Sequence, residues 1–440
     1  MHKRKKLLFF TLFIFILLFS SFIFITRSIP SSFSLVKEYE STLEVNLPFS
    51  LYFKSGADDN STSLTINNEE ISEEPIRLSL DNPLKIRADD PGVFSLNVKL
   101  FGFIPLRTLE VNVLPEVRVM PGGQAIGVLV KSDGVMVVSY SFVERSDGRR
   151  VYPARDAGFR PGDIIKEING EPVLDKSVLG ALIREHGADG PLDFTVERRT
   201  GYREQLQVEP VLSRNGDYQI GLFVEDAVSG VGTLTFYEPQ RKEYGALGHI
   251  ITEATSQRKI DVLEGKIVEA RISGINVGDQ GMPGQKQGLF FETNNILGNI
   301  KRNTPFGIYG VLEADVNNPF FEEPIPVASI SQVEEGTAFL YTVIEEGKIE
   351  KFEVELERVF HQTRPDTRGM VLNITDDSLR TETGGIIQGM SGSPIVQNNK
   401  LVGAVTHVFV NDPSRGYGVF AEWMLKETDI LERETGSTVH

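Results

Sequence analysis

The chain has 440 residues, enough for two or three domains, and it contains no cysteine. The lack of cysteine excludes disulfides, thiolate metal ligands and a cysteine nucleophile. Its 45 basic and 61 acidic residues give a formal net charge of −16, so the surface should repel phosphate backbones, and nucleic acid is not an expected partner.

The first residues have the pattern of a membrane-crossing segment. A short basic tail, residues 1–6, precedes an uncharged apolar run at 7–26, and Arg27 follows. Such a run can cross a hydrocarbon layer of about 30 Å as a helix, and the basic tail favours a cytoplasmic N-terminus with the rest outside. A cleaved signal peptide is the alternative. Because the run exceeds the usual h-region of about 7–15 residues and no Ala-type cleavage site follows, we favour an uncleaved anchor.

Residues 27–115 are predicted to be a small β-rich domain or linker. Two stretches, "LEVNLPFSLYF" and "VFSLNVKLFGF", alternate apolar and polar residues as half-buried strands do. Between them, residues 54–75 are polar, acidic and rich in turn formers. This stretch should be open to proteases, so any self-cleavage is expected between the anchor and the next domain.

Residues 116–212 contain a sharper pattern, "PARDAGFRPGDIIKEINGEPV" followed by "DKSVLGALIREHG" and "PLDFTVERR". Asn169-Gly170 suits a tight hairpin turn, and Asp175 is a plausible N-cap for a helix that ends near Gly187. This order resembles the PDZ domains of bacterial proteases, which have an α+β fold. PDZ domains bind an extended peptide as an extra strand between a strand and a helix.

The resemblance implies a peptide groove in this segment. One wall would be the strand in "DGVMVV" and the other the helix that follows the hairpin. The alternative is that these apolar residues fill a small core, as helix stripes usually do. The implied groove residues are Gly134, Val135, Met136, Val137, Val178 and Leu182.

Residues 213–440 show many short alternating runs separated by Gly, Asn and Pro, which predicts an all-β barrel or sandwich. Near the end stands "GGIIQGMSGSPIVQNNKLVGAVTHVF". A serine hydroxyl needs a base and two donors for the developing oxyanion before it can act as a nucleophile. Here Gly389 and Gly392 flank Ser391 and permit a tight turn.

This turn resembles the "G-D-S-G-G-P" turn of chymotrypsin-like serine proteases. The resemblance implies a double β-barrel with Ser391 as the nucleophile and the N–H groups of Gly389 and Ser391 as the oxyanion hole. Ser393, which replaces a glycine, is the lesser candidate. A Gly-Ser-rich loop that merely joins two strands is the alternative interpretation.

A base must come from one of three histidines, His249, His361 or His407, since the other three lie in the tail, at the C-terminus or at the end of the predicted helix. His249, in "YGALGHII", precedes the serine as the His-Asp-Ser order requires. The carboxylate that orients it is predicted to be Asp376, with the adjacent Asp377 left open as an alternative.

Together the anchor, the PDZ-like segment, "YGALGHII", "NTPFGIYG" and the serine motif resemble the stage IV sporulation protein B peptidases of endospore-forming bacteria. The family's triad then corresponds to His249, Asp376 and Ser391; Asp376 lies in "ITD", where the family usually reads T-D-P and Asp377 here replaces the proline. The sequence has no H-E-x-x-H motif, and neither a metal nor an organic cofactor is expected.

The resemblance implies a membrane-anchored, self-cleaving serine endopeptidase, exported from the forespore into the space between its two membranes. Its protein substrate would be a membrane-bound regulatory complex whose cleavage leads to activation of a mother-cell sigma factor. Further partners would be peptides at the PDZ groove and the membrane itself through residues 7–26. The alternative is a non-catalytic PDZ scaffold of the cell envelope that binds peptides.

The strand after the serine, "KLVGAVTHVF", is predicted to end beside the substrate. By the resemblance, Thr406, His407 and Val408 form an edge that accepts the peptide through main-chain hydrogen bonds. The alternative is that His407 is an ordinary strand residue packed outside the site.

Overall fold

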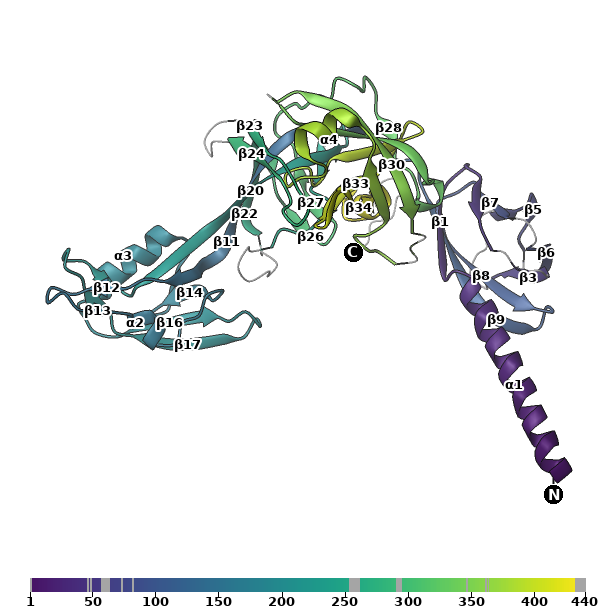
Figure 1. Cartoon of the computed structure of the whole chain (residues 1–440), viewed down its shortest axis with the longest axis horizontal. Coiled ribbons are helices and arrows are strands. Elements are labelled where there is room, and N and C mark those ends of the chain that lie inside the picture. The colour runs from purple at the N-terminus through teal and green to yellow at the C-terminus, as the bar shows by residue number, and fades with distance from the viewer. Residues whose placement is uncertain are drawn as a thin grey trace.

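The chain is mainly β-structure, as the sequence predicts, and Figure 1 shows its parts spread along one axis. The computed structural model describes all residues except 1, 46, 48–49, 57–63, 73, 81–82, 253–261, 290–294, 346, 361, 363 and 432–440. His361, one of the three candidate bases, lies outside the described residues.

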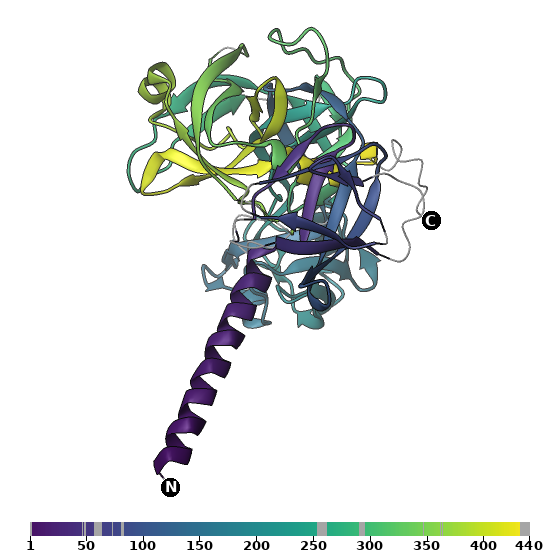
Figure 2. The same ribbon diagram turned by 90° about the vertical axis from the view of Figure 1, so that its right-hand side faces the viewer.

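Helix α1 (His2–Ser28) projects away from the rest of the molecule (Figure 2). Its segment Phe9–Ser28 is long and apolar enough to cross a membrane, a property that signal sequences share. The helix end is fixed to the domain that follows, because the Arg107 guanidinium donates hydrogen bonds to the carbonyls of Thr26 and Ile29.

Residues 32–114 form a small domain of two sheets around one core. Strand β1 pairs in parallel with β9, and the core takes buried side chains from both sheets. The predicted β-rich segment therefore has a hydrophobic core of its own. The strands are β1 (Ser32–Val36), β2 (Ser41–Leu43), β3 (Ser50–Ser55), β4 (Leu64–Ile66), β5 (Glu69–Glu70), β6 (Ile76–Ser79), β7 (Leu84–Ala88), β8 (Gly92–Leu100) and β9 (Ile104–Leu114).

Two β-barrels make up the centre of the molecule. The first barrel has the pairing order β11-β20-β21-β27-β25-β22, and the ring closes because β22 pairs with β11 while Gly298 and Leu312 form a bridge. Its core includes Ile126, Leu234 and Ile308. The strands are β11 (Ala125–Tyr140), β20 (Leu222–Tyr237), β21 (Glu243–Ala246), β22 (Val262–Glu269), β25 (Ile296–Asn299) and β27 (Gly307–Val311).

The second barrel is closed in the order β29-β30-β31-β34-β33-β32. Numbered along the chain, both barrels have the strand order 1-2-3-6-5-4, which agrees with the predicted double barrel. The strands are β29 (Gly336–Val343), β30 (Ile349–Val359), β31 (Met370–Ile374), β32 (Pro394–Gln397), β33 (Lys400–Phe409) and β34 (Asp412–Phe420).

Shorter elements connect and cover the barrels. The β23–β24 hairpin lies beside the loop that leads to Ser391, with Gln285 bridged to Gln388. These elements are β10 (Arg118–Pro121), β23 (Arg271–Asn276), β24 (Gln285–Leu289), β26 (Arg302–Thr304), β28 (Ile325–Pro326), η1 (Ile330–Gln332), α4 (Asp377–Thr383) and α5 (Ala421–Lys426).

A further domain, residues 132–226, is inserted between the first two strands of the first barrel. Strands β11 and β20 are each 16 residues long, and Figure 1 shows them running out of the barrels into this domain. They pair within the barrel as far as Lys131 and Ala227, and pair again from Met136 and Glu225 onward. The sequence predicts a domain boundary between residues 212 and 213, whereas the inserted domain ends within β20. Alternation cannot locate this boundary, because the pattern continues unchanged along a strand that two domains share.

The inserted domain has the elements that the sequence predicts. Asp175 caps α3 by accepting the N–H groups of Ser177 and Val178, and Asn169 and Gly170 both have the positive φ of a tight turn. The elements are β12 (Val143–Glu144), β13 (Arg150–Val151), α2 (Pro153–Asp156), β14 (Ile164–Ile168), β15 (Glu171–Pro172), α3 (Lys176–His186), β16 (Leu192–Glu197), β17 (Arg203–Val208), β18 (Val211–Leu212) and β19 (Tyr218–Gln219).

The insertion makes a testable prediction about which part of the chain folds by itself. Lys131 and Ala227 are direct partners across two antiparallel strands, so an Asn-Gly turn can join them when residues 132–226 are removed. We expect the shortened chain to fold, with a cooperative thermal transition by circular dichroism. A chain that starts at residue 213 lacks β11 and should not fold; the opposite pair of results would contradict the insertion.

Candidate active site

A cleft of about 730 Å³ lies between the two barrels, and both contribute to its wall. It brings Ser391, His249 and His407 together on one surface. Apart from the two histidines, the described residues that line it carry no ionisable side chain. The other lining residues are Val128, Ser229, Gly230, Val231, Leu247, Ile250, Ile251, Thr252, Pro283, Pro305, Thr367, Ile386, Ile387, Gln388, Gly389, Thr406, Val408 and Val410.

The turn from Gly389 to Ser393 shapes the serine site. Gly389 and Gly392 have φ values of 96° and 89°, which favour glycine. A Cβ atom on Gly392 would lie 2.2 Å from the carbonyl oxygen of Thr233, so the turn packs directly on β20. Ser393 is fully buried, whereas Ser391 faces the cleft, and its hydroxyl donates to the Thr406 carbonyl at 3.0 Å. The geometry therefore favours Ser391 over Ser393 as the nucleophile.

The N–H groups of this turn fall into two sets. Those of Met390, Gly392 and Ser393 donate to main-chain carbonyls. Those of Gly389 and Ser391 make no hydrogen bond within the described part of the chain. Buried N–H groups are nearly always paired, so two unpaired ones beside a serine in a cleft suit an oxyanion hole.

His249 enters the cleft just after β21. Leu247 and Gly248, with φ values of 70° and 69°, turn the chain out of the strand. The imidazole Nδ1 lies 2.9 Å from the carbonyl oxygen of Ile250. A carbonyl only accepts, so this contact places the proton on Nδ1 and leaves Nε2 free as a base. Burial lowers the pKa of His249, which keeps the ring neutral.

Asn303 holds the chain next to this histidine. Its side-chain oxygen accepts the Ile251 N–H at 2.8 Å, and its amide donates to the Ile251 carbonyl at 2.9 Å. Both bonds fix the main chain that carries the Ile250 carbonyl, and Asn303 is buried. The sequence gives no indication of this role. An asparagine near Gly and Pro is typical of a turn, and nothing near Asn303 in the sequence indicates that it bonds to Ile251.

The expected pairing of Asp376 with His249 is not seen in the structure. Asp376 is the N-cap of α4, where one carboxylate oxygen accepts the N–H groups of Ser378 and Leu379 and the Ser378 hydroxyl. Burial raises the pKa of the Asp376 carboxyl, but these hydrogen bonds outweigh it and leave the pKa lowered. The adjacent Asp377 is exposed in the first turn of α4, and neither aspartate lines the cleft.

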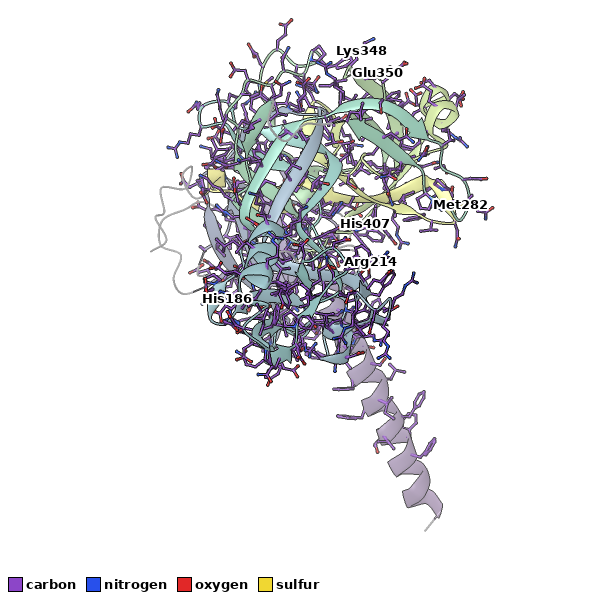
Figure 3. All side chains as sticks on the ribbon, turned by 90° about the vertical axis from the view of Figure 1, so that its left-hand side faces the viewer. His186, Arg214, Met282, Lys348, Glu350 and His407 are labelled. Atoms are coloured by element: carbon purple, nitrogen blue, oxygen red, sulfur yellow. The ribbon has the colours of Figure 1, made fainter. Side chains whose placement is uncertain are left out.

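The predicted substrate residues Thr406, His407 and Val408 all lie on the cleft wall. The His407 ring, labelled in Figure 3, has its centroid 5.4 Å from that of His249. Burial, the neighbouring His249 and Arg368 together lower the pKa of His407. On one side β33 pairs with β34 through this stretch, whereas on the other its pairing with β32 ends at Ala404. Val405 still bonds to the nucleophile turn, since its N–H donates to the Ser393 carbonyl and its carbonyl accepts the Gly392 N–H. Beyond Val405, no described strand pairs with this side of β33, so the edge is open to the cleft from Thr406 onward.

The predicted peptide groove of the inserted domain needs correction. Its strand residues lie in the interior of a sheet, since β11 pairs with β14 on one side and with β20 on the other. Val135 and Val137 are fully buried in the core, Met136 is nearly so, and a Cβ atom on Gly134 would lie 2.7 Å from the Ile165 carbonyl. A strand paired on both sides has no edge to offer a peptide.

The free edge belongs instead to Leu222–Glu225, the first residues of β20. This segment pairs with β11 on one side only among the described residues, and α3 packs beside it. Val178 and Leu182 of α3 contact the same core as Leu222 and Val224, so these two predicted residues lie near the free edge. The sequence signal for this edge is "YQIGLFV", in which a glycine turn precedes an alternating strand. The sequence prediction places this stretch in the all-β segment 213–440 instead.

The geometry makes a prediction about Asp376. Asparagine caps helices as well as aspartate does, so Asp376→Asn should keep both stability and activity. Asp376→Ala should lower the free energy of unfolding by about 1 kcal/mol, because α4 loses its N-cap. Thermal unfolding and cleavage rates of both variants check this. A folded but inactive Asp376→Asn would instead show that the carboxylate orients His249 during the reaction.

Two family models match parts of the chain. Residues 216–425 match the family described as SpoIVB peptidase S55, and residues 147–198 match the PDZ domain family. No curated protein matches the chain.

Among solved structures, the chain is similar to the Rv3671c protease from M. tuberculosis. In the active form the identity is 14%, covering 48% of this chain and 76% of that one, with a TM-score of 0.25. In the inactive form it is 14%, covering 47% and 85%, with a TM-score of 0.23. Neither likeness is close enough to assign a residue or a substrate. The family matches thus assign residues 216–425 to a SpoIVB-type serine peptidase domain and residues 147–198 to a PDZ domain.

Proposed function

We propose that Ser391 and His249 hydrolyse peptide bonds in the cleft between the barrels. The Ser391 hydroxyl leaves the Thr406 carbonyl, gives its proton to Nε2 of His249 and attacks the peptide carbonyl carbon. The N–H groups of Gly389 and Ser391 bind the resulting oxyanion. His249 then passes the proton to the leaving amine, and water hydrolyses the acyl-enzyme by the same route.

One observation carries this proposal: the turn around Ser391 leaves two N–H groups without a partner among the described residues, in a cleft that also holds His249, whose pKa burial lowers. The Ile250 carbonyl takes the place that a carboxylate usually holds at Nδ1. A carbonyl dipole fixes the tautomer as a carboxylate does, but it stabilises the imidazolium less strongly because it carries no full charge.

The cleft also indicates the class of peptide that fits it. Its lining is apolar apart from the two histidines and a few hydroxyls and amides. A charged side chain placed against these apolar residues would lose water without an ion-pair partner among the described lining residues. We therefore infer that the residues next to the scissile bond are apolar or small, and that the peptide adds to the open edge of β33 at Thr406–Val408.

We further propose that the protein cleaves itself and acts in sporulation signalling. The SpoIVB family description supports this role, and helix α1 supports a location at a membrane with the peptidase outside the cytoplasm. By that role, the enzyme acts between the forespore and mother-cell membranes on a membrane-bound regulatory complex, and cleavage leads to sigma-factor activation. The expected self-cleavage stretch, residues 54–75, lies partly outside the described residues.

The test of this function is the loss of proteolysis in Ser391→Ala. Loss of the nucleophile removes covalent catalysis, so self-shortening of the purified protein should fall by about 10³-fold or more. In the sporulating host, the same variant should block processing of the mother-cell sigma factor. Gel analysis with N-terminal sequencing reads the first result and immunoblotting reads the second.

Two further variants separate this function from its alternatives. His249→Ala should be as inactive as Ser391→Ala, whereas His407→Ala should change cleavage preference and leave most of the rate. Full cleavage by Ser391→Ala would favour a PDZ scaffold processed by another protease. Activity in His249→Ala with none in His407→Ala would make His407 the base.

The pH dependence follows from the pKa of His249. His249 accepts a proton only when it is neutral, so the rate is full above its pKa and is lost as the pH falls through it. Burial lowers this pKa below the ordinary value of about 6.5, so the acid half-point of self-cleavage should lie below pH 6.5. A half-point above pH 6.5 would mean that a carboxylate stabilises the imidazolium, contrary to the Ile250 carbonyl contact.

A further inference from the structure

Lys286 is a buried lysine directly behind the nucleophile turn. It lies on β24, and its side chain is 1% exposed. Its hydrocarbon stem packs under Gly389, where an added Cβ would lie 3.0–3.2 Å from three of the stem carbons. A lysine is almost never buried this deeply without a reason, because the ammonium group loses its hydration. The mechanism described above does not use it.

The main chain of Lys286 sets the orientation of one peptide group in the turn. Its N–H donates to the Gln388 carbonyl at 2.9 Å. In a trans peptide the carbonyl and the next N–H point in opposite directions, so this bond turns the Gly389 N–H away from β24. The Gly389 N–H is one of the two proposed oxyanion donors, and Gly389 itself lines the cleft.

The side chain of Lys286 begins a line of hydrogen bonds that reaches the same turn. Its ammonium donates to the Thr342 hydroxyl at 2.8 Å. The Ser393 hydroxyl lies 2.9 Å from that of Thr342 and 3.3 Å from that of Thr233. The Thr233 hydroxyl donates to the Gly389 carbonyl at 2.9 Å.

The Ser393 hydroxyl stands at the centre of this line. An ammonium group only donates, a carbonyl only accepts, and a hydroxyl has a single proton. Thr342 accepts from both Lys286 and Ser393, and the Thr233 hydroxyl uses its proton on the Gly389 carbonyl. This explains why a fully buried serine stands at position 393, two residues after the nucleophile, and why Thr233 and Thr342 are buried hydroxyls.

The burial of Lys286 has an energetic cost that the contacts around it do not remove. Burial lowers its pKa to about 7. Among the described residues no carboxylate lies within ion-pair distance of its ammonium, and Thr342 is its hydrogen-bond partner. A methionine of similar length would fill the same space without this cost. The lysine is therefore not explained by packing alone.

We propose that Lys286 is a positioning residue for the oxyanion hole, holding the Gln388 carbonyl through its main chain and the Gly389 carbonyl through its side chain. Carbonyls on both sides of the Gly389 N–H are then fixed, so that this N–H faces the cleft before substrate arrives. The inference rests on the proposed roles of Ser391 and Gly389. It also gives the β23–β24 hairpin, which carries Lys286, a part in positioning the oxyanion hole that the roles of Ser391 and Gly389 do not require.

The test uses the full-length protein and a fluorophosphonate probe, whose phosphoryl oxygen gains negative charge at the same donors when Ser391 attacks. We expect Lys286→Met to lower the maximal labelling rate, kinact, by about 10- to 100-fold, as for a misplaced oxyanion donor, and to leave the probe constant KI within about twofold. Lys348→Met is the matched control, since Lys348 is exposed on the turn between β29 and β30 (Figure 3). It should label at the wild-type rate.

Two smaller changes cover the case in which Lys286→Met does not fold. Ser393→Ala and Thr342→Val keep the lysine but interrupt the line, and each should lower kinact by about tenfold with KI unchanged. Unchanged kinact in these variants, or in a folded Lys286→Met, would overturn the inference. Undiminished labelling of Ser391→Ala would instead overturn the proposed nucleophile, so the two failures are distinguishable.

Discussion

The hydrogen bonds of Thr233 are the constraint on which the active site depends. Its N–H donates to the Ser391 carbonyl, its carbonyl accepts the Leu247 N–H, and its hydroxyl donates to the Gly389 carbonyl. One residue of β20 thus holds the nucleophile turn, which belongs to the second barrel, and the loop to His249, which belongs to the first. Thr233 is fully buried, so these bonds are shielded from water, and breaking them would leave polar groups unpaired.

The same strand carries the free edge of the PDZ domain. Leu222–Glu225 lies at one end of β20 and Thr233 lies near the other, with Ser229 and Val231 lining the cleft between them. Because the PDZ domain is inserted between the first two strands of the barrel, two continuous strands join it to the peptidase rather than a single linker. A peptide that pairs with β20 would add to the strand that holds the nucleophile turn.

The sequence predicts the local parts of this account well and the tertiary parts poorly. The mainly β fold and the tight turn around Ser391 follow from alternation and glycine spacing, and the double barrel follows from the resemblance to chymotrypsin-like proteases. The role of Asp376 could not be judged from spacing, because an aspartate before a helix serves equally as a cap or as a triad member. The PDZ resemblance puts Gly134–Val137 on the groove, and this prediction is wrong because pairing order cannot be seen in a single strand. Lys286 and Asn303 gave no signal, since their partners lie far away along the chain.

The most direct measurement of the central claim is the site of covalent attack by a fluorophosphonate, mapped by mass spectrometry of the digested protein. The account predicts a single adduct on Ser391, formed only while the protein is folded and lost when His249 is replaced by alanine. An adduct on Ser393 or on a serine outside the cleft, or no adduct on a folded protein that still shortens itself, would contradict it.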